Sequence, residues 1–292
     1  MKSLFIIIFA VAALLILPAC GQKQQGDLQH NFKQGITELN VKFLPNLPPE
    51  RIYPQSNFKM VLELDNQAAY DVAEGQVTIL GLDPTYLQVP QPNQPFGPLL
   101  GRSFTAPSGE KAFVEFDGSA GSLIAGAEEY RAPYFLKLSY NSKMEFADTV
   151  CINPKVYQVY DAGCAVENKK SYSGQGAPLA ITNLEEIISP GIGAAVDFRL
   201  ELKNRGRGKV GSVTLNSAKL GNQELTCTFQ GTLNRVMNFT SEQQETTLLC
   251  RTTLRDQNSY TTTVSLDFSY LYELVQQQTL NVIGPRARRT GW

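Results

Sequence analysis

Histidine and tryptophan are almost missing from this chain of 292 residues, which contains only His30 and Trp292. With a single histidine, a relay in which histidine activates a serine or cysteine nucleophile is close to excluded. No CxxC pair is present, so a zinc site is a disfavoured alternative. The GxSxG pattern of serine hydrolases is also absent. We therefore expect a protein that is not an enzyme and that holds no cofactor or metal.

Charge is scarce as well, because charged residues make up 18% of the chain and the net charge is −1. A chain without excess positive charge has no overall field that attracts nucleic acid, so we expect no nucleic-acid partner. Hydrophobic residues reach 42%, which is enough to bury a core. The length allows two ordinary domains.

No part of the chain beyond the N-terminal segment has the periodicity of a long amphipathic helix. Instead, apolar and polar residues alternate over residues 58–65, 134–140 and 263–270. Such alternation predicts strands with one buried face and one solvent face, and therefore antiparallel sheets. The glutamine-rich residues 272–278 are interpreted as a continuation of the last strand pair.

The N-terminus holds a long apolar run. Fourteen apolar residues, Leu4–Leu17, follow the positive charge of Lys2. As a helix this run spans about 21 Å, which is less than the hydrocarbon core of about 30 Å. The run therefore predicts a signal peptide and not a membrane-spanning helix.

The end of this run, Leu17-Pro18-Ala19-Cys20, resembles the lipobox of prokaryotic lipoproteins, although Pro18 is atypical. The resemblance implies that the thiol of Cys20 carries a diacylglycerol and that the peptide is cut just before it. Two acyl chains are enough for stable anchoring, so the lipid bilayer is an expected partner. An uncleaved anchor and an ordinary signal peptide are alternatives. We expect an exported, membrane-anchored lipoprotein that faces outside the cytoplasm.

Four further cysteines form an even set, which suits disulfides in an oxidising compartment. They are Cys151, Cys164, Cys227 and Cys250. The sequence alone allows three pairings. We favour the nearest-neighbour pairing, Cys151–Cys164 and Cys227–Cys250, because it keeps each bridge close to one domain.

Three segments recur in the same order along the chain, which predicts a duplicated domain. The matches are 58–66 (FKMVLELDN) with 196–204 (VDFRLELKN), 75–79 (GQVTI) with 211–215 (GSVTL), and 136–140 (LKLSY) with 266–270 (LDFSY).

The strand that ends in Leu202-Lys203-Asn204-Arg205-Gly206 resembles the CARDB-type and related immunoglobulin-like repeats of prokaryotic surface proteins. In those repeats the asparagine closes the second strand and the glycine makes the turn. The first copy keeps Asn66 but has Ala68 where the glycine would be. The resemblance implies a sandwich of about seven strands and accompanies adhesion, cell-wall or spacer roles.

The predicted fold is all-β, with two tandem immunoglobulin-like antiparallel β-sandwich domains after a lipoprotein signal peptide. The expected boundaries are a signal peptide at 1–19, the lipidated Cys20 and a flexible tether at 20–34, domain 1 at 35–155, a linker at 156–177, domain 2 at 178–284 and a basic tail at 285–292.

Some motifs suggest chemistry. Gly206, Gly208 and Gly211 match GxGxxG, but a dinucleotide site needs a following helix, whereas residues 212–215 predict a strand. We interpret the motif as a hairpin turn. The carboxylate pairs Glu128-Glu129 and Glu185-Glu186 are adjacent in sequence, and neighbours on a strand point to opposite faces. Neither pair forms an acid–base couple by itself.

Surface recognition has its own candidates. Asn238-Phe239-Thr240 is a glycosylation sequon, with a chance match as the alternative. Arginines in the tail suit either a solvated tail or contact with anionic lipid or an acidic partner. Eight tyrosines could belong to the core and its rim or could in part line a glycan-binding face. They are Tyr53, Tyr70, Tyr86, Tyr130, Tyr134, Tyr140, Tyr270 and Tyr272.

We expect a lipid-anchored cell-surface protein with a non-catalytic binding, adhesion or structural role in the envelope. An envelope protein or a glycan is the candidate partner. The alternatives are a secreted hydrolase, for example one that acts on glycans, with a site assembled from loop carboxylates, and a subunit of a surface filament. Loop-face recognition is favoured over strand exchange, because the tether and the tail are poor in β-forming residues.

Overall fold

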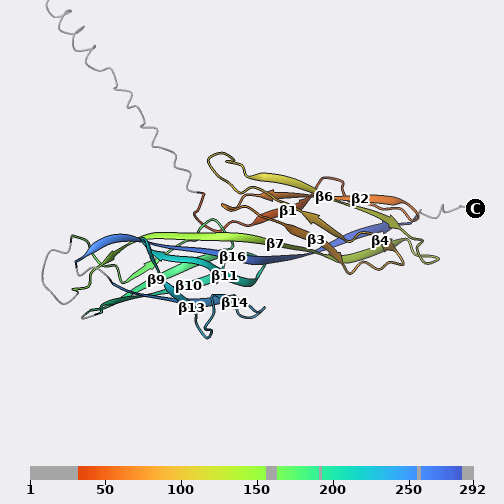
Figure 1. Cartoon of the computed structure of the whole chain (residues 1–292). Coiled ribbons are helices and arrows are strands. Elements are labelled where there is room, and N and C mark those ends of the chain that lie inside the picture. The colour runs from red at the N-terminus through yellow and green to blue at the C-terminus, as the bar shows by residue number, and fades with distance from the viewer. Residues whose placement is uncertain (1–31, 156–162, 191–192, 255–257, 285–292) are drawn as a thin grey trace, which may run out of the picture. The chain divides into compact units, whose positions relative to one another are not determined.

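The computed structural model describes residues 32–155, 163–190, 193–254 and 258–284, and their regular structure consists of β-strands (Figure 1). The all-β prediction is confirmed. Within these ranges no helix has the length and apolarity needed to cross a membrane. The predicted signal peptide, the residue Cys20 and the basic tail lie outside the described residues.

The first seven strands form repeat 1. One of its sheets has the order β1-β2-β6-β4, and in the other sheet β3 lies between β5 and β7. The strands are β1 (Leu39–Phe43), β2 (Asn57–Asn66), β3 (Gly75–Leu80), β4 (Leu87–Gln88), β5 (Asn93–Phe96), β6 (Glu110–Ala120) and β7 (Glu129–Ile152).

The remaining strands form repeat 2. Its five-stranded sheet has the order β13-β15-β10-β9-β8, and β11 pairs with β12, β14 and β16. The strands are β8 (Lys169–Ser171), β9 (Leu179–Ser189), β10 (Ala195–Asn204), β11 (Lys209–Leu220), β12 (Gln223–Glu224), β13 (Thr226–Phe229), β14 (Val236–Asn238), β15 (Glu245–Thr253) and β16 (Tyr260–Ile283).

The two repeats have matching topology. β2 pairs with β1 and β6, and β10 pairs in the same way with β9 and β15. Apolar residues of both strands are fully buried between sheets, which is the main source of their stability. These residues are Met60, Leu62 and Leu64 of β2, and Phe198, Leu200 and Leu202 of β10, all at most 1% exposed.

The third sequence match needs a correction of two residues. Val77 of β3 faces Leu138, whereas its counterpart Val213 of β11 faces Tyr270. The structural counterpart of residues 136–140 is therefore 268–272 and not 266–270. Register shifts in β11 after Val210 and Leu215 changed this pairing, and such bulges leave no clear mark in a sequence alignment.

The long strands β7 and β16 belong to both repeats. They pair antiparallel over all 24 residues of each strand, from Glu129 opposite Ile283 to Ile152 opposite Tyr260. β3 joins β7 only along residues 135–140, and β11 joins β16 only along 264–273. Each repeat therefore completes its sheet with half of a strand from the other repeat. Figure 1 shows β7 and β16 running side by side.

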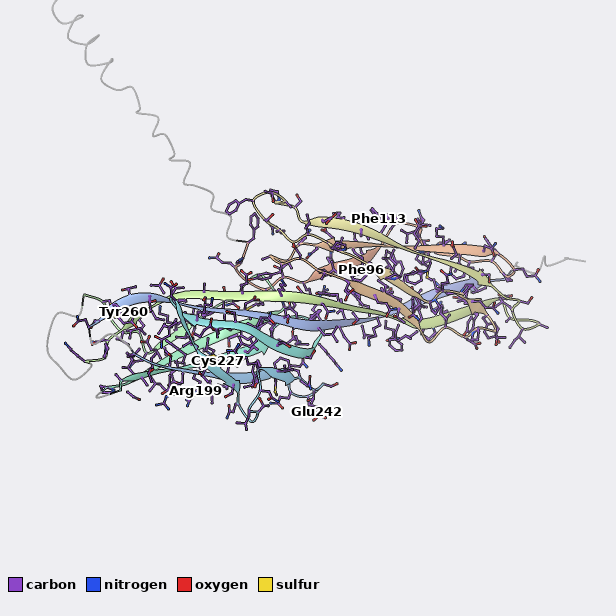
Figure 2. The ribbon with its side chains drawn as sticks, in the orientation of Figure 1. Phe96, Phe113, Arg199, Cys227, Glu242 and Tyr260 are labelled. Atoms are coloured by element: carbon purple, nitrogen blue, oxygen red, sulfur yellow. A yellow bond between two sulfur atoms is a disulfide. The ribbon has the colours of Figure 1, made fainter. Side chains whose placement is uncertain are left out.

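Because β7 and β16 belong to both repeats, the expected domain boundaries must be compared with the structure. The described residues belong to one compact unit that begins at Phe32, and the division into domains at 35–155 and 178–284 stays a prediction. The expected linker contributes a strand, because residues 169–171 form β8 and pair with β9. The glutamine-rich stretch continues β16, as predicted. Phe96 of repeat 1 and Cys227 of repeat 2 are labelled in Figure 2.

Candidate functional site at the junction of the repeats

Two equivalent asparagines end β2 of repeat 1 and β10 of repeat 2. The side-chain oxygen of Asn66 accepts a hydrogen bond from the Ala68 N–H at 3.2 Å, and its amide donates to the Tyr70 carbonyl at 3.0 Å. Asn204 repeats this pattern with the Gly206 N–H at 3.0 Å and the Gly208 carbonyl at 2.8 Å. Both side chains satisfy backbone groups that a turn would otherwise leave unpaired.

The turn after Asn204 binds repeat 1. The Tyr272 hydroxyl donates to Glu38 at 2.5 Å and accepts a hydrogen bond from the Gly208 N–H at 2.6 Å. Arg207 forms an ion pair with the same carboxylate. Burial raises the pKa of Tyr272, so its hydroxyl stays protonated and remains a donor. This cluster joins the segment before β1 to the turn between β10 and β11.

The GxGxxG motif lies in this cluster and is not a hairpin turn. β10 belongs to the five-stranded sheet and β11 to the seven-stranded sheet, so the turn crosses from one sheet to the other. The hairpin interpretation is therefore wrong, because it assumed that the two consecutive strands pair. A Cβ at Gly206 would collide with the Tyr272 hydroxyl, and one at Gly208 with the Glu273 carbonyl. These glycines allow close packing on β16.

The end of the expected tether contacts the folded unit. The Phe32 ring packs edge-on against Phe104 with centroids 5.8 Å apart, and the Arg102 guanidinium lies 5.1 Å from the Phe32 ring. Lys33 forms an ion pair with Glu145 of β7 at 2.5 Å. The chain therefore enters repeat 1 beside the middle of β7.

A cavity of about 530 Å³ lies next to this entry point. Loop residues of repeat 1 form one wall, and the centre of β7 and Ser269 of β16 form the other. The Tyr70 hydroxyl donates to the Glu145 carbonyl at 3.0 Å across this cavity. Its size lies in the range of small-molecule sites. The lining includes Lys33, Tyr70, Asp71, Leu100, Asn141 and Lys143.

Glu185 and Glu186 of β9 point to opposite faces, as expected. Glu185 lies on the outer face of its sheet and pairs with Arg199 at 3.1 Å. Glu186 is 3% exposed, and neither carboxylate oxygen has a hydrogen-bond partner among the residues that the structure describes. Desolvation raises the pKa of Glu186 to about 7. Glu129 forms an ion pair with Arg131 at 2.7 Å. Glu185 and Glu186 therefore do not form an acid–base couple, and Glu128 is exposed and precedes β7.

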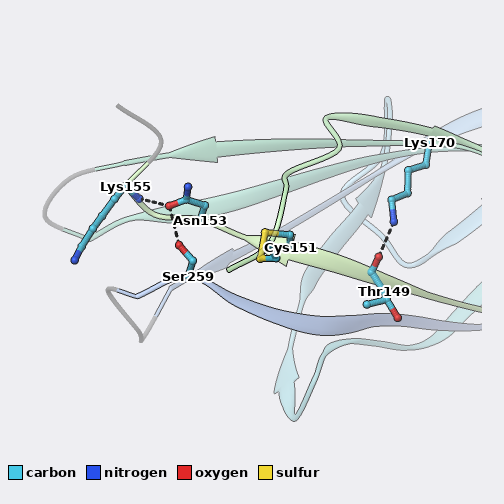
Figure 3. Close-up of a disulfide and its surroundings, with 7 residues drawn as sticks. Thr149, Cys151, Asn153, Lys155, Lys170 and Ser259 are labelled. Atoms are coloured by element: carbon cyan, nitrogen blue, oxygen red, sulfur yellow. Dashed lines mark hydrogen bonds between the residues drawn. A yellow bond between two sulfur atoms is a disulfide. The ribbon is translucent and has the colours of Figure 1, made fainter. Parts of the chain in front are cut away.

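Both predicted disulfides are present. Cys151, near the end of β7, is bonded to Cys164, and Figure 3 shows this bond near the hydrogen bond from Lys170 to the Thr149 carbonyl. Cys227 of β13 is bonded to Cys250 of β15, directly opposite in register. Asn238 is exposed at the end of β14, and its glycosylation stays a prediction.

The tyrosines divide into two groups. The core group is at most 6% exposed and consists of Tyr70, Tyr134, Tyr140, Tyr270 and Tyr272. Tyr53, Tyr86 and Tyr130 are more exposed and belong to the loops or strand start at one end of repeat 1. The rings of Tyr86 and Tyr130 lie 4.2 Å apart, and Tyr53 is 57% exposed. Only this second group remains available for stacking on a glycan.

The sequence did not predict the junction, by which we mean the contacts of Glu38 with Tyr272 and Arg207 and of Lys33 with Glu145. Glu38, Glu145 and Lys33 carry no motif, and their partners lie more than a hundred residues away in the chain. The signal that pointed to this region was the repeated asparagine of the L-x-N motif. No group of three or more His, Cys, Asp or Glu suited to a metal ion occurs in the part of the chain that the structure describes.

The comparisons with known proteins do not identify a family. No family profile and no curated protein sequence match the chain. Among solved structures, the chaperone DraB of E. coli is 10% identical over 78% of this chain and 86% of its own, with a TM-score of 0.21. The Salmonella enterica SafA pilin in complex with the SafB chaperone is 8% identical over 74% of this chain and 86% of its own, with a TM-score of 0.21. A C-terminal globular domain of an oligosaccharyltransferase from Pyrococcus abyssi is 7% identical over 84% of this chain and 48% of its own, with a TM-score of 0.24.

Proposed function

We propose that the protein is an exported, lipid-anchored surface protein with a non-catalytic binding or structural role in the envelope. One observation carries the proposal. The polar groups at the junction are used to hold strands and repeats together, as Glu38 does with Tyr272 and Arg207, and Glu145 with Lys33. Such a junction is a rigid scaffold that presents loops and edges to a partner.

The disulfides support the exported location. Disulfides form and persist in oxidising compartments, and this chain has one at the end of β7 and one across β13 and β15. Anchoring through Cys20 rests on the lipobox resemblance. The docked end of the tether would then place the junction within a short chain length of the membrane.

Cys20→Ser tests the anchor. We expect the variant to leave the membrane fraction, or to keep its signal peptide, because the acylated thiol is lost. Detergent partitioning and intact mass measure both effects. Leu233→Ser is the control, since Leu233 is 93% exposed and the change leaves the lipobox intact. A Cys20→Ser protein that partitions and migrates like the wild type would contradict the anchor.

The binding role is tested with the mature protein against envelope extracts and a glycan array. We expect reproducible capture of an envelope protein or a glycan. Tyr53→Ala should abolish capture if the partner is a glycan that stacks on the exposed ring. A hydrolase or transferase activity of the purified protein, lost on a single polar substitution, would refute the non-catalytic role.

A further inference from the structure

One stretch of β16 has a partner on one side only. β11 covers β16 as far as Glu273, which faces Lys209, and Ile52 forms a bridge with Val282. Between these two contacts, residues 274–280 pair with β7 and with no other described strand. We call this stretch the β16 slot. It is a recess in the sheet edge, bounded by β11 and by the segment around Ile52.

The direction of the backbone groups in the slot follows from its neighbours. The Ile52 N–H donates to the Asn281 carbonyl, and the Ile283 N–H donates to the Ile52 carbonyl, both on the side away from β7. Backbone groups alternate sides along a strand. The N–H and C=O groups of Val275, Gln277 and Thr279 therefore face the open side, and no partner for them exists within the described ranges.

The corresponding stretch of β7 in repeat 2 differs, because side chains bond to two of its outward carbonyls. The Tyr70 hydroxyl donates to the Glu145 carbonyl at 3.0 Å, and the Lys170 amine donates to the Thr149 carbonyl at 2.6 Å. Folded proteins usually cover or block such edges. The two matching halves therefore treat the same edge differently: described side chains bond to two outward carbonyls of β7, whereas none bonds to the outward groups of the β16 slot.

One apolar side chain, Val275, lies on the open edge strand and is 55% exposed. Phe135 of β7 faces Gln277 one strand further into the sheet and is 46% exposed. At the Ile52 end of the slot is a hollow of about 390 Å³, lined in part by Pro48, Glu50 and Arg51. An added strand would place alternate residues against Val275 and its last side chain at the hollow.

We propose that the β16 slot accepts an extended segment of another polypeptide, about seven residues long, as an added strand. Alternate residues of this segment are apolar and lie on the face that bears Val275. A second copy cannot use its own slot for this purpose, because the flanks of both recesses would collide before the edges met. The inference rests on the proposed binding role and gives the class of partner as an extended peptide.

The probe is a synthetic peptide with the sequence of residues 211–218, GSVTLNSA, labelled with a fluorophore. It comes from β11, which already pairs with this same edge of β16. Amide hydrogen exchange of the full mature chain is measured with and without the peptide, together with fluorescence anisotropy. We expect saturating peptide to slow exchange of the Val275, Gln277 and Thr279 amides by about tenfold or more, because the added strand protects these outward N–H groups. A peptide with proline at two central positions is the control and should have no effect.

Substitutions separate backbone pairing from side-chain contact. Gln277→Pro removes one outward N–H and should weaken peptide binding by about tenfold or more, whereas Gln277→Ala keeps that N–H and should bind like the wild type. If Gln277→Pro lowers the melting temperature, Thr279→Lys replaces it, because an edge lysine opposes strand addition. If saturating peptide left amide exchange unchanged, or if the Gln277→Pro and Gln277→Ala variants bound the peptide equally, strand addition at the β16 slot would be contradicted. Because the probe is defined, this result is independent of whether envelope capture succeeds.

Discussion

At the scale of single residues, Asn66 and Asn204 link the sequence to the junction most directly. Asn66 is fully buried, and its amide also donates to the Leu99 carbonyl at 3.1 Å. Its loss would leave buried backbone groups without partners. We expect Asn66→Ala to lower the free energy of unfolding by about 1–3 kcal/mol. Urea titration measures this change, and Asn57→Ala at the exposed start of β2 should be near neutral.

Glu186 predicts a pH dependence. Its pKa is raised from 4.5 to about 7 by desolvation, so the folded protein binds this proton more tightly than the unfolded chain does. The stabilising contribution is therefore complete below pH 4.5 and is lost as pH rises toward 7. Glu186→Gln should remove this decline, at about 1.4 kcal/mol for each unit of pKa difference.

Glu185→Gln is the control for this prediction, since Glu185 lies on the opposite face and its exposed ion pair with Arg199 contributes about 0–1 kcal/mol. Chemical denaturation at several pH values between 4.5 and 7.5 compares the two variants, a range set by the raised pKa. If the free energy of unfolding of the wild type and of Glu186→Gln changed with pH in the same way, the raised pKa of Glu186 would be contradicted.

At the scale of elements, neighbouring positions of β16 should respond in opposite ways to the same change. The Gln276 N–H faces β7, whereas the Gln277 N–H faces the open edge. Gln276→Pro removes a ladder hydrogen bond and should cost about 1–3 kcal/mol more than Gln277→Pro. Thermal unfolding of both variants checks this. Equal destabilisation would mean that the edge assignment is wrong.

The strands show which parts of a fold a sequence determines. Alternation predicted β2, β7 and β16, and the glutamine-rich end of β16 followed correctly from its neighbours. The pairing of β7 with β16 was not predictable, because alternation gives a strand's faces and not its partner a hundred residues away. The tyrosines illustrate the same limit, since five of eight proved buried and only packing decides which.

At the scale of the whole molecule, the shared strands predict one unfolding transition. Phe116 of β6 is 1% exposed in the core of repeat 1. Phe116→Ala should cost about 3–5 kcal/mol, and the loss should also speed amide exchange in β10 of repeat 2. Calorimetry together with hydrogen exchange measures both effects. Two separate transitions, with β10 unaffected, would instead support independent domains.

The entry of the chain beside the middle of β7 has a mechanical consequence. If Cys20 holds the protein at a membrane and a partner strand pulls on β16, tension passes from Lys33 and Glu145 into β7 and across to β16. Any part of this load that runs along the strands is resisted by many ladder hydrogen bonds of β7 and β16 together, which do not open one after another. Repeat 2 beyond the junction lies outside this force path, and its loops would stay unloaded while the anchor is under strain.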